Sequence, residues 1–77
     1  MNIERLVAMV NDIGRYFAAE PDEALGVAGI ADHLKRFWEP GMRKQIVAHL
    51  AAGGEGLEPL AKKGIARLAE IDSKLHA

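Results

Sequence analysis

Three histidines, His33, His49 and His76, are the first residues in this sequence that could bind a metal ion or transfer a proton. A metal site on one helix needs two ligands three or four residues apart, as in a His-Glu-x-x-His pair. Apart from chance surface neighbours, none of the three histidines has a second histidine, aspartate or glutamate in that arrangement. Because the chain also has no cysteine, ligands would have to come from different helices, and we expect no metal site.

Nucleophilic catalysis has no convincing candidate either. The only serine is Ser73, and there is no threonine, which excludes a Ser-His-Asp triad. The acidic pairs Asp22 with Glu23 and Glu55 with Glu58 fall at expected helix starts, where carboxylates complement the positive end of the helix dipole. The sequence therefore predicts no catalytic residue and a protein that is not itself an enzyme.

The glycine-rich run from Gly53 to Gly56 is similar to a phosphate-binding loop only in composition. A P-loop also needs a strand before it and a lysine and a hydroxyl residue at its end, and these are missing here. Glycine just past a helix supplies the left-handed conformation that satisfies the last carbonyl groups. We interpret the run as a helix end and a loop, and we predict no bound cofactor.

The segment from His33 to Lys44 is the strongest candidate for a binding surface. It holds two large aromatic residues around a Pro-Gly bend, with Glu39 as its single acid. Its four cations are Lys35, Arg36, Arg43 and Lys44. In one interpretation Phe37 and Met42 fill the core and the cations form a solvated rim. In the other the segment is a docking corner, because Trp and Arg are enriched at protein interfaces.

We adopt the docking corner as the candidate protein-binding site. Its residues are His33, Arg36, Phe37, Trp38, Pro40, Met42 and Arg43. A helix-turn-helix that reads DNA is disfavoured, because the helix after the bend turns apolar beyond Arg43 and Lys44 and the net charge of the chain is −1.

Hydrophobic periodicity predicts an all-α fold, a small bundle of three to four short helices in one domain, residues 1–77. The predicted helices span about residues 3–18, 22–38, 41–52 and 58–73. Asn2 is expected to cap the first helix, and Pro40 suits the first position of the third. The polar face of the first helix is expected to be solvated and carries Glu4, Arg5, Asn11, Asp12 and Arg15. Close approach of another backbone would explain Gly26 and Gly29 inside the second helix.

The composition and the N-terminal residues indicate where in the cell the protein is expected. A domain of 77 residues hides only about 60% of its unfolded surface, and 49% of these residues are hydrophobic. The N-terminus has an acid within its first five residues and no apolar run, so we expect no signal peptide. No apolar stretch approaches the roughly 20 residues that span a bilayer. We therefore expect a cytoplasmic protein that does not bind membranes.

Several segments resemble one known family. These are Asn2–Val7, Asn11–Ile13, Val27–Leu34, Phe37–Pro40 with Met42 and Arg43, and His49–Leu50 before Gly53 and Gly54. They are similar to the delta subunit of the molybdenum- or tungsten-dependent, NAD-linked formate dehydrogenases. The resemblance covers about residues 2–68, and the Trp38-x-Pro40-x-Met42-Arg43 corner is its most specific part.

This resemblance implies a small companion of an enzyme that oxidises formate to carbon dioxide and passes the electrons to NAD. The larger subunits of that enzyme carry bis-molybdopterin guanine dinucleotide, iron-sulfur clusters and FMN. The expected function is that of a non-catalytic subunit or assembly factor that binds and stabilises the catalytic alpha subunit.

Three alternatives stay open beside it. A chaperone could bind the phosphates of the molybdenum cofactor through the basic corner, since arginine pairs bidentately with phosphate. A helical nucleic-acid-binding module is less favoured. In isolation the chain is also a candidate homodimer, because amphipathic bundles with surplus apolar surface self-associate.

Overall fold

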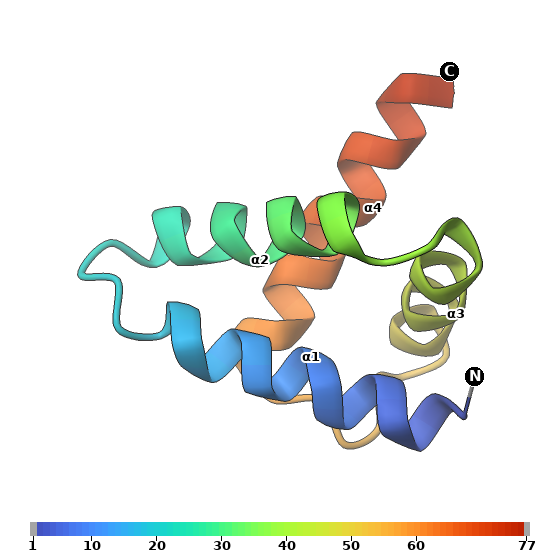
Figure 1. Ribbon diagram of the computed structural model, residues 1–77, viewed down its shortest axis with the longest axis horizontal. Coiled ribbons are helices and arrows are strands. Elements are labelled where there is room, and N and C mark those ends of the chain that lie inside the picture. The colour runs from blue at the N-terminus through green and yellow to red at the C-terminus, as the bar shows by residue number, and fades with distance from the viewer. Residues whose placement is uncertain (1, 77) are drawn as a thin grey trace.

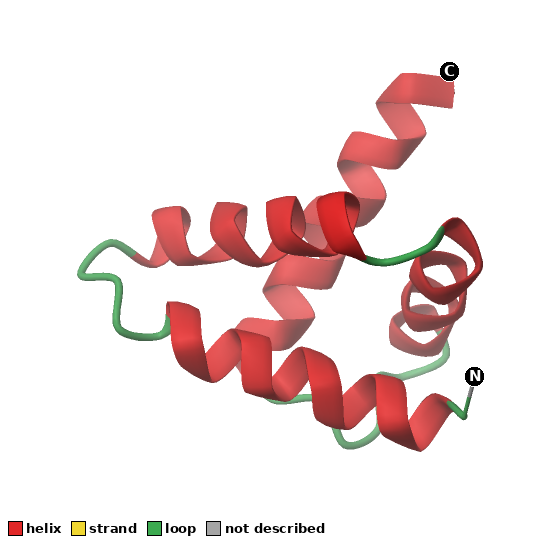
Figure 2. Cartoon of the chain, viewed as in Figure 1, coloured by secondary structure: helices red, strands yellow, loops and turns green. Residues whose placement is uncertain are grey.

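The computed structural model describes residues 2–76, and the side chains as far as Ser73. The helices are α1 (Ile3–Phe17), α2 (Glu23–Phe37), α3 (Pro40–Ala51) and α4 (Pro59–His76) (Figure 1). No strand occurs within residues 2–76, so the all-α prediction is confirmed (Figure 2). The observed bounds lie within one residue of the predicted ones at every end except the last, where α4 continues to His76. Met1 and Ala77, the ends of the predicted domain, lie outside the described residues.

Polar side chains and a proline determine where three of the helices begin. Asn2 is the N-cap of α1, as predicted, and its Oδ1 accepts a hydrogen bond from the Glu4 N–H at 2.7 Å. Asp22 caps α2 in the same way through the Ala24 N–H at 2.9 Å. Pro40 opens α3, where its missing N–H breaks no helical hydrogen bond. These signals are local, which explains why the sequence alone indicates the helix starts closely.

Helix α4 organises the core. It crosses behind α1 and α2 and also contacts α3 (Figure 1). The largest fully buried side chains come from all four helices: Leu6 and Val10 of α1, Ile30 and Leu34 of α2, Ile46 of α3, and Ile65 and Leu68 of α4. Full burial of such a side chain contributes roughly 1.5–3 kcal/mol. The four helices therefore share one core, and α4 contacts each of the other three.

Glycines allow the neighbours of α2 to come close. A Cβ at Gly64 of α4 would lie 2.3 Å from Cγ2 of Ile30, which is shorter than any van der Waals contact. A Cβ at Gly26 would lie 3.0 Å from the carbonyl oxygen of Phe17, so the predicted approach of a backbone there is confirmed. At Gly29 the neighbour is instead the ring of Phe17, 2.4 Å from such a Cβ. Larger residues at these positions would push α1 and α4 away from α2.

The loop between α3 and α4 depends on glycine for its path. Gly53, Gly54 and Gly56 have φ angles of 124°, 67° and 83°, a region that side chains with a Cβ rarely adopt. The Gly54 N–H donates to the carbonyl oxygen of His49 at 2.9 Å and so closes the end of α3. The prediction that this run ends a helix and forms a loop is confirmed.

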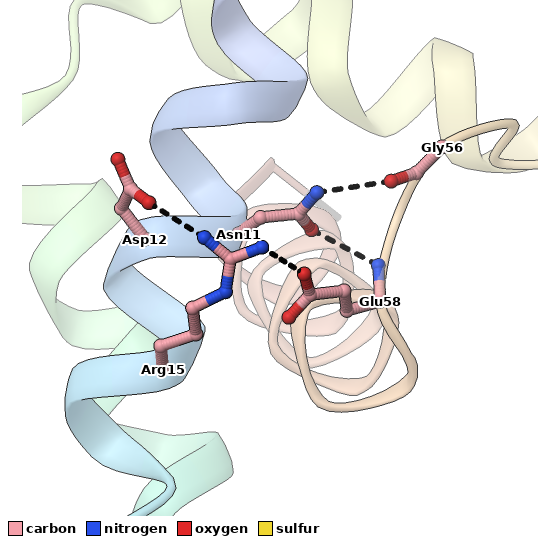
Figure 3. A network of polar contacts seen from close by, with 5 residues as sticks. All are labelled: Asn11, Asp12, Arg15, Gly56 and Glu58. Carbon is pink, nitrogen blue, oxygen red and sulfur yellow. Dashed lines mark hydrogen bonds and ion pairs between the residues drawn. The ribbon is translucent and has the colours of Figure 1, made fainter.

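Asn11 of α1 fastens this loop to the core (Figure 3). Its Nδ2 donates to the Gly56 carbonyl and its Oδ1 accepts from the Glu58 N–H, both at 2.9 Å. Next to it, the exposed Arg15 pairs with Asp12 at 3.0 Å and with the Glu58 carboxylate, which raises the pKa of Arg15 above its ordinary value. The prediction that Asn11 lies on a solvated face is wrong, because the loop covers it and leaves it 8% exposed.

Candidate functional site

The bend between α2 and α3, where the sequence predicts a docking corner, separates its two aromatic residues. Trp38 is 6% exposed and belongs to the core, whereas Phe37 is 70% exposed. The interpretation that places Phe37 in the core is therefore wrong. Helical register gives the reason, since Trp38 follows the buried Leu34 by four residues, whereas Phe37 follows His33 by four on an outer face.

The two arginines at this bend, Arg36 and Arg43, are engaged by their own neighbours. Nη1 of the half-buried Arg43 donates to the carbonyl oxygen of Lys35 at 2.8 Å. The Nε of Arg43 is buried and has no hydrogen-bond partner within the described residues. Arg36 pairs with Asp32, one helical turn earlier, at 3.3 Å. Arg43 thus braces α3 against the C-terminal end of α2 and does not belong to a fully solvated rim.

The other predicted site residues divide between the surface and the core. Pro40 is exposed at the start of α3, and Met42 is half-buried and packs against the core. His33 is half-buried, and its ring lies 4.8 Å from that of Phe37 between centroids. The structure therefore brings His33 and Phe37 together on one surface, while Trp38 and Met42 support the bend from inside.

His33 and Phe37 continue a surface to which α1 also contributes. We call this surface the aromatic face and define it by Ile13, Tyr16, Phe17, His33 and Phe37. Its first four members line a cavity of about 430 Å³. Tyr16 is 76% exposed, and its ring meets that of Phe17 edge-on at 5.0 Å. Two aromatic side chains are therefore held largely in solvent on helical backbone.

Sequence reasoning missed the contribution of α1 to this surface. Tyr16 lies off the apolar stripe of its helix, and an aromatic residue off the stripe was the available signal. The pairing with His33 and Phe37 depends on how α1 packs beside α2, which no local pattern encodes. Contiguous exposed apolar surface of this kind marks interaction sites more often than scattered single residues do.

A second hollow lies between α3 and α4, and we call it the α3/α4 groove. It has a volume of about 560 Å³, follows α3 from Pro40 to Ala51, and has Ala69 and Asp72 of α4 as its other wall. Val47, midway along, is half-buried. Most of its lining residues are apolar, and the charged ones are Arg43, Lys44 and Asp72.

The described residues include no group of three or more His, Cys, Asp or Glu placed to hold a metal ion. Nε2 of His49 lies 2.8 Å from the carbonyl oxygen of Glu55, so this ring is tied to the α3–α4 loop. His33 packs on Phe37, and the side chain of His76 lies outside the described residues. Within the described helices, none is both long and apolar enough to cross a membrane.

Comparison with known protein families gave a match that covers most of the chain. Residues 5–65 match the family described as NADH-dependant formate dehydrogenase delta subunit FdsD. This match includes the bend between α2 and α3, the aromatic face and the loop fastened by Asn11. Comparison with curated proteins and with solved structures gave no match.

Proposed function

The chain belongs to the formate dehydrogenase delta subunit family, and from this premise we propose that it binds and stabilises the catalytic alpha subunit as a non-catalytic subunit or assembly factor. The chain itself would carry out no chemical step. Formate oxidation would take place in the larger subunits, which would carry the molybdenum or tungsten cofactor, the iron-sulfur clusters and FMN. The delta subunit would contribute through contact alone.

The aromatic face is the observation that carries this proposal. Tyr16 and Phe37 are 76% and 70% exposed, although the burial of one such ring is worth roughly 1.5–3 kcal/mol. Their rings rest on Phe17 and His33, so little conformational freedom would be lost on binding. A partner that covers both rings would gain apolar contact from a surface that is already ordered.

The contacts at the bend favour this function over direct binding of the molybdenum cofactor by the basic corner. A phosphate would have to compete with Asp32 for Arg36 and with the Lys35 carbonyl for Arg43. Arginine binds phosphate strongly when its planar donors are free to pair with two oxygens. Protein docking requires no such release, and it uses the aromatic rings that the fold leaves exposed.

Co-purification tests the proposal directly. The tagged full-length chain would be co-expressed with the formate dehydrogenase subunits, and recovery of the alpha subunit would be compared between wild type, Tyr16→Ser and Phe37→Ser. We expect each variant to recover the alpha subunit about tenfold less well, equivalent to roughly 1.4 kcal/mol of binding free energy. Leu25→Ser is the matched control, because Leu25 is 59% exposed but lies outside the aromatic face.

Two results would count against the proposal. If the wild-type chain recovers no alpha subunit, the function is wrong. If both ring variants recover as much alpha subunit as Leu25→Ser does, the aromatic face is not the contact. Trp38→Ala is unsuitable for this test, because removal of a core side chain would confuse loss of binding with loss of folding.

A further inference from the structure

We propose that the α3/α4 groove binds an amphipathic helix of the partner, whose apolar stripe is bordered by acidic side chains along the edge that faces α3. The inference rests on the proposed function, because the partner is the alpha subunit named there. It adds a second contact surface, distinct from the aromatic face, and it specifies the chemistry of the segment that this surface recognises.

Helix α3 carries apolar residues beyond the face that it packs into the core. Ile46 is fully buried in the core. Val47 is half-buried, and Ala48 and Ala51 are exposed along the groove. A surface helix of a globular protein normally has one apolar stripe and a polar face opposite to it. The second apolar side of α3 is therefore suited to cover by another element.

The shape of the groove suits a helix as that element. Its walls are the two helices α3 and α4, and α4 extends past the other helices toward its C-terminal end (Figure 1). Ala48, Ala51 and Ala69 have small side chains, so an incoming helix could approach both walls closely. Recognition of an amphipathic helix in an apolar groove uses anchors at i, i+3 or i+4, and i+7. A groove that follows α3 from Pro40 to Ala51 is long enough for such a pattern.

The charges on the two walls determine which helix fits. Arg43 and Lys44 lie on the α3 wall, and Asp72 lies on the α4 wall. Acidic side chains of the occupant would be attracted to the α3 wall and repelled by Asp72, which fixes its orientation. Arg43 attracts acidic side chains through its charge and need not release its bond to the Lys35 carbonyl. Lys44 is exposed and has no ion pair within the described residues.

Affinity measurements on the purified chain and alpha subunit test the groove with two variants. Ala48→Glu puts an acid among the apolar residues that line the groove, and Lys44→Glu cancels the net positive charge of the α3 wall, because Arg43 remains. We expect each to weaken binding at least tenfold, and we expect the Lys44→Glu complex to lose part of the salt dependence seen with wild type. Ala8→Glu and Lys62→Glu are matched controls, since both positions are exposed and outside the groove. Far-ultraviolet circular dichroism would establish that all four variants remain helical.

A cross-link identifies the occupant. The chain has no cysteine, so Ala48→Cys gives a single thiol that can carry a benzophenone group into the groove. Illumination of the labelled complex should join it to an apolar, acid-bearing helical peptide of the alpha subunit, which mass spectrometry would identify.

The outcomes separate this inference from the proposed function. Wild-type affinity in Ala48→Glu and Lys44→Glu would overturn the inference and leave the function intact. Absence of binding by the wild-type chain would overturn both. A cross-link to a second copy of this chain, together with a dimer in light scattering that Ala48→Glu abolishes, would show that the groove is a homodimer contact and would overturn the inference.

Discussion

Replacement of Asn11 by alanine should destabilise the fold more than any other single change on the polar side of α1. The side chain makes two hydrogen bonds of 2.9 Å, to the carbonyl of Gly56 and the N–H of Glu58. These partners are 45 and 47 residues away in the sequence, so Asn11 joins the α3–α4 loop to the first helix. Loss of the side chain removes both links and leaves the loop without this fastening.

The expected loss of stability in Asn11→Ala depends on how far solvent can reach the Gly56 carbonyl and the Glu58 N–H. A hydrogen bond contributes about 0.5–1.5 kcal/mol net, and an unsatisfied buried group costs about 1–3 kcal/mol more. Gly56 is exposed and Glu58 is half-buried, so water can reach the groups that Asn11→Ala leaves unpaired. We therefore expect a loss near the sum of the two net bonds, about 2 kcal/mol. In a domain of this size, that lowers the melting temperature by roughly 8–16 °C.

Thermal and urea unfolding, followed by circular dichroism at 222 nm, would measure this loss. Asp12→Ala is the matched control, because Asp12 is exposed and its pair with Arg15 is worth at most about 1 kcal/mol. A loss of less than about 0.5 kcal/mol in Asn11→Ala would refute the structural role of the amide.

The substitution Asn11→Asp adds a test of the hydrogen-bond directions. The introduced carboxylate can still accept from the Glu58 N–H, but its second oxygen would face the Gly56 carbonyl. Burial and this oxygen would raise its pKa in the folded state, so the protonated form, which can donate, is favoured there. Stability relative to wild type should therefore decline as the pH rises from about 4 through the raised pKa, and it should be fully recovered when the pH returns to about 4. A difference from wild type that does not change with pH would contradict the assigned directions.

Four further substitutions test other parts of the fold by urea unfolding. Gly64→Ala should lose about 1–3 kcal/mol, because its Cβ would meet Ile30 at 2.3 Å, and an unchanged midpoint would contradict the crossing of α2 and α4. Gly41→Ala should be neutral or stabilising by up to about 1 kcal/mol, because a Cβ there would have no atom from elsewhere in the chain within 4 Å. Trp38→Ala should lose about 3–5 kcal/mol, whereas Phe37→Ala, at a position 70% exposed, should change stability little. Equal losses at these two positions would contradict the register of α2.

The sequence predicted the helices better than it predicted their contacts. Caps and breakers such as Asn2, Pro40 and Gly53 act on their own neighbours, so they indicate where a helix begins or ends without knowledge of the fold. Asn11 was misplaced because its partners lie in a loop that returns to α1 only when the chain is folded. A polar residue covered by a distant loop has the same local pattern as a solvated one.

For the candidate site too, the sequence indicates the local features but not the tertiary contacts. The bend between α2 and α3 is visible in the sequence, and so is its unusual content of aromatic and basic residues. Whether Phe37 or Trp38 faces the core depends on the exact end of α2, where one residue changes the face. Tyr16 joins the same surface only because α1 lies beside α2, a tertiary fact that hydrophobic periodicity does not contain.

The position of α4 also affects how the chain behaves while it is being made. A nascent chain that has reached Ala51 contains α1, α2 and α3, but Ile30 and Leu34 still lack the helix that covers them. At roughly 5–20 residues per second, the ribosome needs about one to three seconds more to reach Leu68. Until α4 is in place, the apolar sides of the first three helices lack the element that covers them. Stable folding therefore has to follow the emergence of α4.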